Sequence, residues 1–247
     1  MVEKIFAVIS DIHGNSWALQ TVLADLKKRN VDVIFNLGDS LYGPLDPAGT
    51  FQLLRKYDMV SISGNEDRLI VESVGSRTKN PTLVYVLSEL DSEALHWLES
   101  LPQTRTVDDF FLCHGTPKKD DEYLFEKVTP RGVELRNAHE LLREIRTINQ
   151  AVVCCGHSHM QNLLEPCPGK YIVNPGSIGL PAYEDAQPYL HAMESGNPNA
   201  SYCIITKENG RYRIEQILVS YDWETAAKCA ANNHREDWSK WLRTGKA

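Results

Sequence analysis

Short apolar runs of strand length alternate with amphipathic segments over the first third of the chain. The runs at 4–10, 31–38 and 59–65 have the length and the flanking turn residues of buried strands. Between them, apolar side chains recur at helical spacing over 16–29, and a second helix that begins at a proline is expected over 47–56. A strand–helix–strand–helix–strand order is typical of βαβ units, so we expect a largely parallel sheet.

The middle of the chain is helical and the last third returns to strands. Amphipathic patterns predict helices at 81–90 and 91–101, a hairpin follows at 104–115, and another helix is expected near 131–147. Asn209-Gly210 is a strong signal for a tight turn between two antiparallel strands. Four further strands are predicted at 151–157, 170–177, 201–208 and 210–220.

Nothing in the sequence divides the chain into separate units, since it has no internal repeat and no low-complexity linker. We therefore expect one domain over 1–247 with a helical tail at about 223–244. The segment 178–200, rich in Pro, Gly and Asn, is expected to be the longest irregular loop, and such loops are commonly functional. The element order predicts an α/β fold with two sheets face to face, helices outside, and a site at the carboxyl ends of the strands.

The composition excludes only a few classes of function. The 247 residues carry a formal net charge of -7, which argues against a nucleic-acid coat or a binder of anionic membranes. A phosphate substrate stays compatible with this charge, because bound metal ions can reverse the local sign. No apolar run reaches membrane-spanning length, no signal-peptide pattern is present, and the six cysteines form no CxxC pair, so we expect reduced, buried cysteines in a cytoplasmic protein.

Polar side chains that commonly bind metal ions follow five of the apolar runs. Each lies in the stretch where a strand is expected to end and a loop to begin. Four histidines, two aspartates and one asparagine match what two adjacent divalent ions require, with one carboxylate free to bridge. The candidate metal ligands are Asp11, His13, Asp39, Asn65, His114, His157 and His159.

Each of these motifs is weak alone, and their conjunction carries the interpretation. Asp11 and His13 are two residues apart, so in an extended segment both side chains point the same way. The pair His157 and His159 has the same spacing. A Gly-Asp step such as the one at Asp39 is common in ordinary turns. Five such motifs, each at the end of a strand, favour a metal centre over unrelated turns.

With these motifs in place, the sequence resembles the calcineurin-like metallophosphoesterases, in particular their small single-domain bacterial and archaeal members. The resemblance extends from Lys4 to about Ser220. It implies a four-layer αββα sandwich of two mixed sheets flanked by helices, with two catalytic metal ions. By this resemblance the first ion would be held by Asp11, His13, Asp39 and His159, and the second by Asp39, Asn65, His114 and His157, with Asp39 bridging.

The sequence departs from the family at one position. Many members carry a histidine after Gly-Asn that stabilises the transition state or protonates the leaving group. Here Glu66 takes that place as the candidate catalytic residue, while Asp67, which orients the histidine in relatives, remains with nothing to orient. Beside two ions Glu66 should be ionised and should repel a dianionic monoester more than a monoanionic diester. The alternative is a surface carboxylate at the start of a helix.

Four residues outside the ligand motifs are interpreted from their position in the sequence. Tyr42, three residues after a predicted ligand, and His191, in the long loop, are candidate substrate-binding residues. Trp238 and Trp241 have helical spacing and are interpreted as packing residues.

The reaction that we expect is hydrolysis of a small phosphodiester by in-line attack of a hydroxide shared by two divalent ions. The ligand set suits manganese, with iron, nickel or zinc as alternatives. Rival interpretations are a hydrolase of nucleotides or dinucleoside polyphosphates, a protein phosphatase, and a metal-poor scaffold that has lost catalysis; the intact ligand set argues against the scaffold. Homo-oligomerisation is left open by the sequence.

Overall fold

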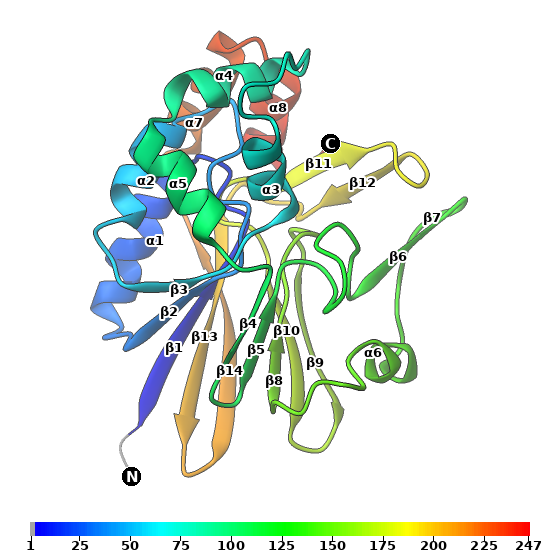
Figure 1. Ribbon diagram of the computed structural model, residues 1–247. Coiled ribbons are helices and arrows are strands. Elements are labelled where there is room, and N and C mark those ends of the chain that lie inside the picture. The colour runs from blue at the N-terminus through cyan, green and yellow to red at the C-terminus, as the bar shows by residue number, and fades with distance from the viewer. Residues whose placement is uncertain (1–2) are drawn as a thin grey trace.

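Two five-stranded mixed sheets face each other in the computed structural model, which describes residues 3–247 (Figure 1). In the first sheet, three neighbouring strands run parallel and a C-terminal hairpin adds two antiparallel strands at one edge. The strand order is β14-β13-β1-β2-β3. The bounds are β1 Lys4–Ile9, β2 Val33–Asn36, β3 Met59–Ser61, β13 Ala200–Glu208 and β14 Arg211–Val219.

The second sheet has a parallel centre and antiparallel edges. Its order is β4-β5-β8-β10-β9, with β5, β8 and β10 parallel and the two edge strands antiparallel to their neighbours. The bounds are β4 Thr104–Val107, β5 Phe110–Cys113, β8 Val152–Cys154, β9 Gln161–Cys167 and β10 Lys170–Pro175.

Strand β1 shows why the apolar runs are continuous. Phe6 and Val8 face the second sheet, whereas Ala7 and Ile9 face the helices, so both faces of the strand are buried. Between the sheets, Phe6 lies 4.6 Å from Phe110, measured between ring centroids. A strand that is buried on both faces cannot alternate with polar residues, which explains why the run carries no period-two pattern.

The helices form the two outer layers. Seven helices share the apolar core on the outer face of the first sheet, and α6 (Ala138–Glu144) packs on the outer face of the second. The seven are α1 (Ser16–Lys28), α2 (Pro47–Leu54), α3 (Asn65–Glu72), α4 (Pro81–Glu89), α5 (Ser92–Ser100), α7 (Trp223–Asn232) and α8 (Glu236–Thr244). This arrangement confirms the predicted α/β sandwich of two mixed sheets flanked by helices (Figure 1). Among the described residues, no helix has the length and apolarity needed to span a membrane.

Two predicted segments differ in detail. The helix expected near 131–147 is shorter, because β6 (Glu126–Thr129) and β7 (Gly132–Leu135) form a hairpin before α6 begins. The segment 178–200, expected to be irregular, contains the hairpin of β11 (Ala182–Asp185) and β12 (His191–Glu194). Both hairpins consist of four-residue strands, which are too short for a clear period in the sequence. Strand β9 was also not predicted.

Candidate metal centre

The loops that follow β1 and β2 are tied together by backbone hydrogen bonds. The N–H of Asp11 donates to the carbonyl of Gly38 at 3.0 Å, and the N–H of His13 donates to that of Asp39 at 2.9 Å. A Cβ at Gly38 would lie 2.3 Å from the backbone nitrogen of Gly64, in the loop after β3, so glycine is required for this approach. Three loops therefore meet at one edge of the first sheet, as expected for the carboxyl ends of parallel strands.

Most of the predicted ligands have a backbone conformation that is rare outside glycine. The φ angle is 55° at Asp11, 52° at His13, 53° at Asp39, 67° at His157 and 60° at His159. These five are among nine such non-glycine residues in the described chain. A left-handed conformation at a non-glycine residue costs on the order of 1–3 kcal/mol and persists where the surroundings enforce it, which is typical of functional sites.

Three of the predicted histidine ligands share one hydrogen-bond pattern. In each, Nδ1 lies within hydrogen-bond distance of a backbone carbonyl, which can only accept. Nδ1 therefore carries a hydrogen, and Nε2 is the atom of each ring that can offer a lone pair to a metal ion once it is deprotonated. The pairs are His13 with Tyr42 (3.1 Å), His114 with Leu37 (2.8 Å) and His159 with Leu180 (2.7 Å).

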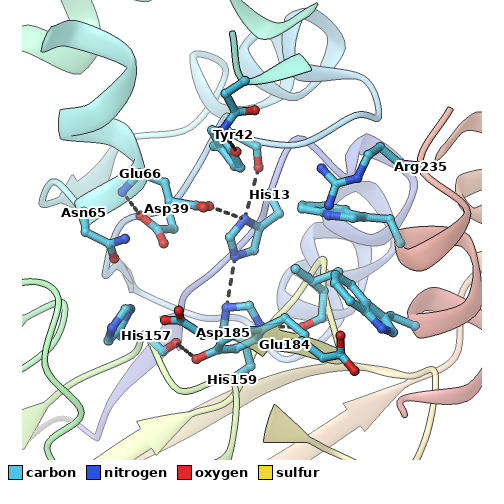
Figure 2. A pocket seen from close by; sticks show the side chains of 15 residues that line it. His13, Asp39, Tyr42, Asn65, Glu66, His157, His159, Glu184, Asp185 and Arg235 are labelled. Atoms are coloured by element: carbon cyan, nitrogen blue, oxygen red, sulfur yellow. Dashed lines mark hydrogen bonds and ion pairs between the residues drawn. The ribbon is translucent and has the colours of Figure 1, made fainter. Parts of the chain in front are cut away.

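The Nε2 atoms converge on the two buried aspartates. The Nε2 atoms of His13 and His159 lie 3.0 Å apart, and Asp11 Oδ1 is 3.3 Å from the Nε2 of His159. On the other side, Asp39 Oδ2 lies 3.2 Å from the Nε2 of His114. Figure 2 shows His13 above His159, with Asp39 and His157 across the cavity from them. The seven predicted ligands, which come from both sheets, thus lie at one end of the sandwich.

Two separate groups of these residues could each hold a cation. One consists of Asp11, His13 and His159; the other consists of Asp39, His114 and His157. A third group joins His13 and Asp39 to Glu66.

Among the seven predicted ligands, three buried atoms have no hydrogen-bond partner within residues 3–247, namely Asp11 Oδ1, Asn65 Oδ1 and His114 Nε2. An unpartnered buried polar atom is costly, and all three can offer a lone pair, so the residues fit divalent ions.

The electrostatics of the cluster favour the addition of positive charge. Burial opposes ionisation of Asp11, yet the neighbouring His159 and His114 hold its pKa well below the usual range. Burial and the nearby His114 lower the pKa of His157 to about 4, so this ring is neutral at neutral pH. In His13, the surrounding carboxylates, with Glu66 foremost, outweigh burial and raise the pKa to about 9. The cluster therefore attracts positive charge, which divalent ions would supply.

Glu66 and Asp67 occupy the first turn of α3 and have different roles. The N–H of Glu66 donates to Asp39 Oδ1 at 2.9 Å, and its own Oε2 lies 3.2 Å from the Nδ1 of His13. The Asp67 carboxylate, expected to have nothing to orient, accepts the N–H groups of Ser40 (2.9 Å) and Gly64 (3.0 Å). Asp67 therefore fixes the loops that carry Asp39 and the start of α3.

The cluster opens into a cavity of about 460 Å³, which is larger than a single phosphate group requires. Tyr42 lines it, as predicted for a substrate-binding residue, and so does Glu66. Sequence reasoning missed several lining residues, because their elements are distant in the chain. They are Asn80, Leu180, Tyr183, Glu184, Asp185 and Arg235, together with Trp238 and Trp241, whose helical spacing indicated packing only.

His191, the other predicted substrate-binding residue, is not among the residues that line this cavity. It is buried on β12, and its Nε2 lies 2.9 Å from the hydroxyl of Tyr123. The Tyr123 ring packs against His157 at 4.9 Å between centroids, and its hydroxyl accepts from Tyr183 at 2.7 Å. His191 therefore contacts the cluster through Tyr123.

A sandwich of two mixed sheets that gathers buried carboxylates and histidine Nε2 atoms at its strand ends defines a class of metal-dependent hydrolases. The calcineurin-like phosphoesterase superfamily domain matches residues 5–196, and the chain belongs to this superfamily. The family is metal-dependent, and the protein is a hydrolase that acts on phosphoester bonds.

Similar proteins share the full length of the chain. The protein MJ0912 of Methanocaldococcus jannaschii is 29% identical over 262 residues, which cover 96% of each sequence. A metallophosphoesterase crystal structure from Sphaerobacter thermophilus has a TM-score of 0.75 at 24% identity and covers 98% of this chain and 99% of that one. The structure of PH1004 from Pyrococcus horikoshii has a TM-score of 0.71 at 18% identity, with 98% of both chains covered. The two structures show a common fold.

Proposed function

We propose that the protein is a phosphodiesterase with two divalent ions. Asp39 would bridge them, because its two carboxylate oxygens face different neighbours, the N–H of Glu66 and the Nε2 of His114. When bound, the ions would polarise the ester and activate water as the nucleophile. We propose Asp11, His13, Asp39 and His159 as ligands of one ion and Asp39, Asn65, His114 and His157 as ligands of the other.

The hydrogen bonds of the chain support a rigid centre. Backbone carbonyls hold three histidine rings by Nδ1, and Asp67 holds two of the ligand loops, so little reorganisation is needed when ions bind. Manganese is the proposed ion, with iron, nickel or zinc as alternatives, since this mixture of nitrogen and oxygen ligands suits all four. We further propose a cytoplasmic location, which agrees with the six free cysteines, of which four are buried, Cys229 is half-buried and Cys167 is exposed.

The preference for diesters rests on Glu66. Its side chain is 24% exposed, lines the cavity and lies against His13, which supports a role in the site over that of a surface carboxylate. Burial raises its pKa to about 7 while His13 opposes that shift, and nearby cations would favour the charged form further. A negative charge here disfavours a dianionic monoester relative to a monoanionic diester.

Tyr42 is proposed to contact the substrate. Its side chain lies at the cavity wall, where its hydroxyl accepts a hydrogen bond from Asn80 Nδ2 at 3.0 Å. A contact between His191 and substrate stays a prediction, and it would require a substrate that extends past the ring of Tyr123.

The test is the ratio of kcat/KM for matched aryl monoesters and diesters in Glu66→Gln and Glu66→His. We expect the ratio to rise in both variants, about tenfold, because the repulsion of the second negative charge is removed. Glu66→His should rise more, since an imidazole can also donate a proton. Glu72→Gln is the matched control, because its side chain is 59% exposed on the same helix. An unchanged ratio in both Glu66 variants would refute the role of this carboxylate.

A further inference from the structure

The cavity has a second half, which faces away from the metal-ligand cluster. One wall comes from β11, with Glu184 and Asp185. The facing wall comes from the C-terminal helices, with Arg235, Trp238 and Trp241. Helix α8 contacts β11, and the two elements lie near each other in Figure 1. The C-terminal wall lies beyond residues 5–196, the part of the chain that matches the superfamily domain.

The positive charge of Arg235 is already satisfied within the protein. Its Nε and Nη2 bond the two carboxylate oxygens of Asp237 at 2.9 and 2.6 Å, and its guanidinium lies 5.4 Å from the centre of the Trp238 ring. A third bond connects it to Thr82. Arg235 is the sole lysine or arginine among the residues that line the cavity, so this half offers no free cation to a second phosphate.

Two carboxylates of this half, in contrast, are not paired with a cation in the described part of the chain. Neither Glu184 nor Asp185 forms an ion pair with any of residues 3–247; Asp185 accepts only the N–H of Gln187 at 2.9 Å. Figure 2 shows both on the side of the cavity that faces Tyr42 and Glu66. With Glu66, three carboxylates line the cavity outside the ligand set.

Aromatic groups cover most of the remaining wall. Tyr42, Tyr183, Trp238 and Trp241 line the cavity together with Leu180. Aromatic faces bind apolar groups and attract organic cations through the ring quadrupole. The Trp238 ring also meets the His13 ring edge-on at 5.8 Å, so this wall is fixed directly to the ligand cluster. An organic group attached to a phosphate at the metals would therefore reach these side chains.

We propose that this half of the cavity is a subsite for the organic group of the ester, and that it selects a cationic alkylammonium group beside an apolar segment. The inference rests on the proposed function and deepens it, because it names the substrate class. It also disfavours dinucleoside polyphosphates, whose additional phosphates would meet carboxylates without a free cation.

Three p-nitrophenyl phosphodiesters test this subsite with the same leaving group. Their second ester group is choline, its uncharged isostere 3,3-dimethylbutanol, or an alkanol of similar length that ends in a carboxylate. We expect kcat/KM to fall in that order, with the choline ester about fivefold better than the isostere, as one favourable charge pair in a solvated cleft provides. Equal values for the cationic and neutral esters, or a preference for the carboxylate, would overturn the inference.

Charge reversal identifies the side chains responsible. Glu184→Lys should abolish or invert the preference for the choline ester over its isostere. Glu99→Lys makes the same change at a side chain that is 70% exposed on α5, outside the cavity, and should keep the preference. If both variants keep it, the subsite is refuted.

If the wild type hydrolyses all three esters equally, the subsite proposal fails while the proposed phosphodiesterase function stands. If it hydrolyses no diester with any of the four metals, the proposed function fails and the subsite proposal fails with it.

Discussion

The two ends of the sheet sandwich use the same unusual backbone conformation for different purposes. At the far end, Asp108 and Asn209 have φ angles of 48° and 50°, and each closes a hairpin, β4–β5 or β13–β14 (Figure 1). Asn and Asp tolerate the left-handed region and are ordinary there. At the site end, five Asp and His residues have the same conformation without closing a hairpin; four of them are buried and His157 is half-buried. There the conformation occurs at residues whose side chains meet in the ligand cluster.

The two ends also differ in how their charged side chains are partnered. At the far end, Asp109 is 41% exposed and bonds Lys207 and Tyr212, so its charge is balanced by partners and by solvent. At the site end, Asp11 and Asp39 are buried beside histidines, and some polar atoms have no partner. The comparison teaches that charged groups at the far end are balanced by partners within the protein, whereas the site end keeps buried polar atoms that suit divalent ions.

The largest effect is expected from removing the charge of Asp39, the proposed bridging ligand. Asp39→Asn keeps the shape of the side chain and an acceptor for the N–H of Glu66, but it should lower kcat/KM about a thousandfold, because charge stabilisation at the reaction centre is lost. Bound metal, measured by elemental analysis, should fall as well. Asp108→Asn makes the same change in a hairpin at the far end and should leave both readouts unchanged. An Asp39→Asn enzyme within tenfold of the wild type would remove Asp39 as the bridge.

A smaller effect is expected from crowding at a glycine. In Gly64→Ala, the new Cβ would lie 2.1 Å from Asp39 Oδ1, so Asp39 must move; we expect a loss of about 3 kcal/mol in unfolding free energy and weaker metal binding. In Gly75→Ala the new Cβ would have no atom within 4 Å, so only the φ of 75° disfavours the change. This backbone strain costs about 1 kcal/mol and should not change metal affinity. Urea unfolding and metal titration measure the two effects. Equal metal affinity in both variants would show that the loop at Gly64 can relax.

The smallest effect concerns pH at the far end. The hydrogen bonds from Lys207 and Tyr212 lower the pKa of Asp109 below its ordinary value of 3.8. The folded state therefore favours the ionised form, and the stabilisation is complete above pH 4 and lost as the pH falls through the lowered pKa. Asp109→Asn should cost about 0.5 kcal/mol at pH 7, as expected for an exposed ion pair, and nothing at the acid limit. Urea unfolding of the two proteins across pH 2–7 tests this; parallel curves would mean that Asp109 contributes no charge stabilisation.

The sequence was sufficient for the parts of the site that follow strands. Each predicted ligand comes just after an apolar run, and parallel neighbours deliver their carboxyl ends to one edge, so proximity could be inferred without coordinates. The wall of the cavity formed by β11 and α8 could not be inferred in this way. Strands β11 and β12 have four residues each, and β11 is positioned by contacts with α8, about 50 residues away in the sequence.

The tail shows a second limit of sequence reasoning. The spacing of Trp238 and Trp241 predicted a helix and buried rings, and both are confirmed, at 3% and 6% exposure. Periodicity reveals which face of a helix is covered but not what covers it. Here one of the groups that contact Trp238 is the ring of His13, a predicted ligand more than 200 residues away in the sequence. The same side chains thus pack the core and line the cavity.

The separation of α8 from the metal ligands along the sequence has a consequence for how such an enzyme could change over evolutionary time. Every proposed metal ligand precedes residue 160, whereas one wall of the cavity comes from Arg235, Trp238 and Trp241. Substitutions or recombination within this later segment could therefore exchange that wall and leave the proposed metal centre intact. A lineage could acquire new substrates by changing this segment while it inherits the same chemistry.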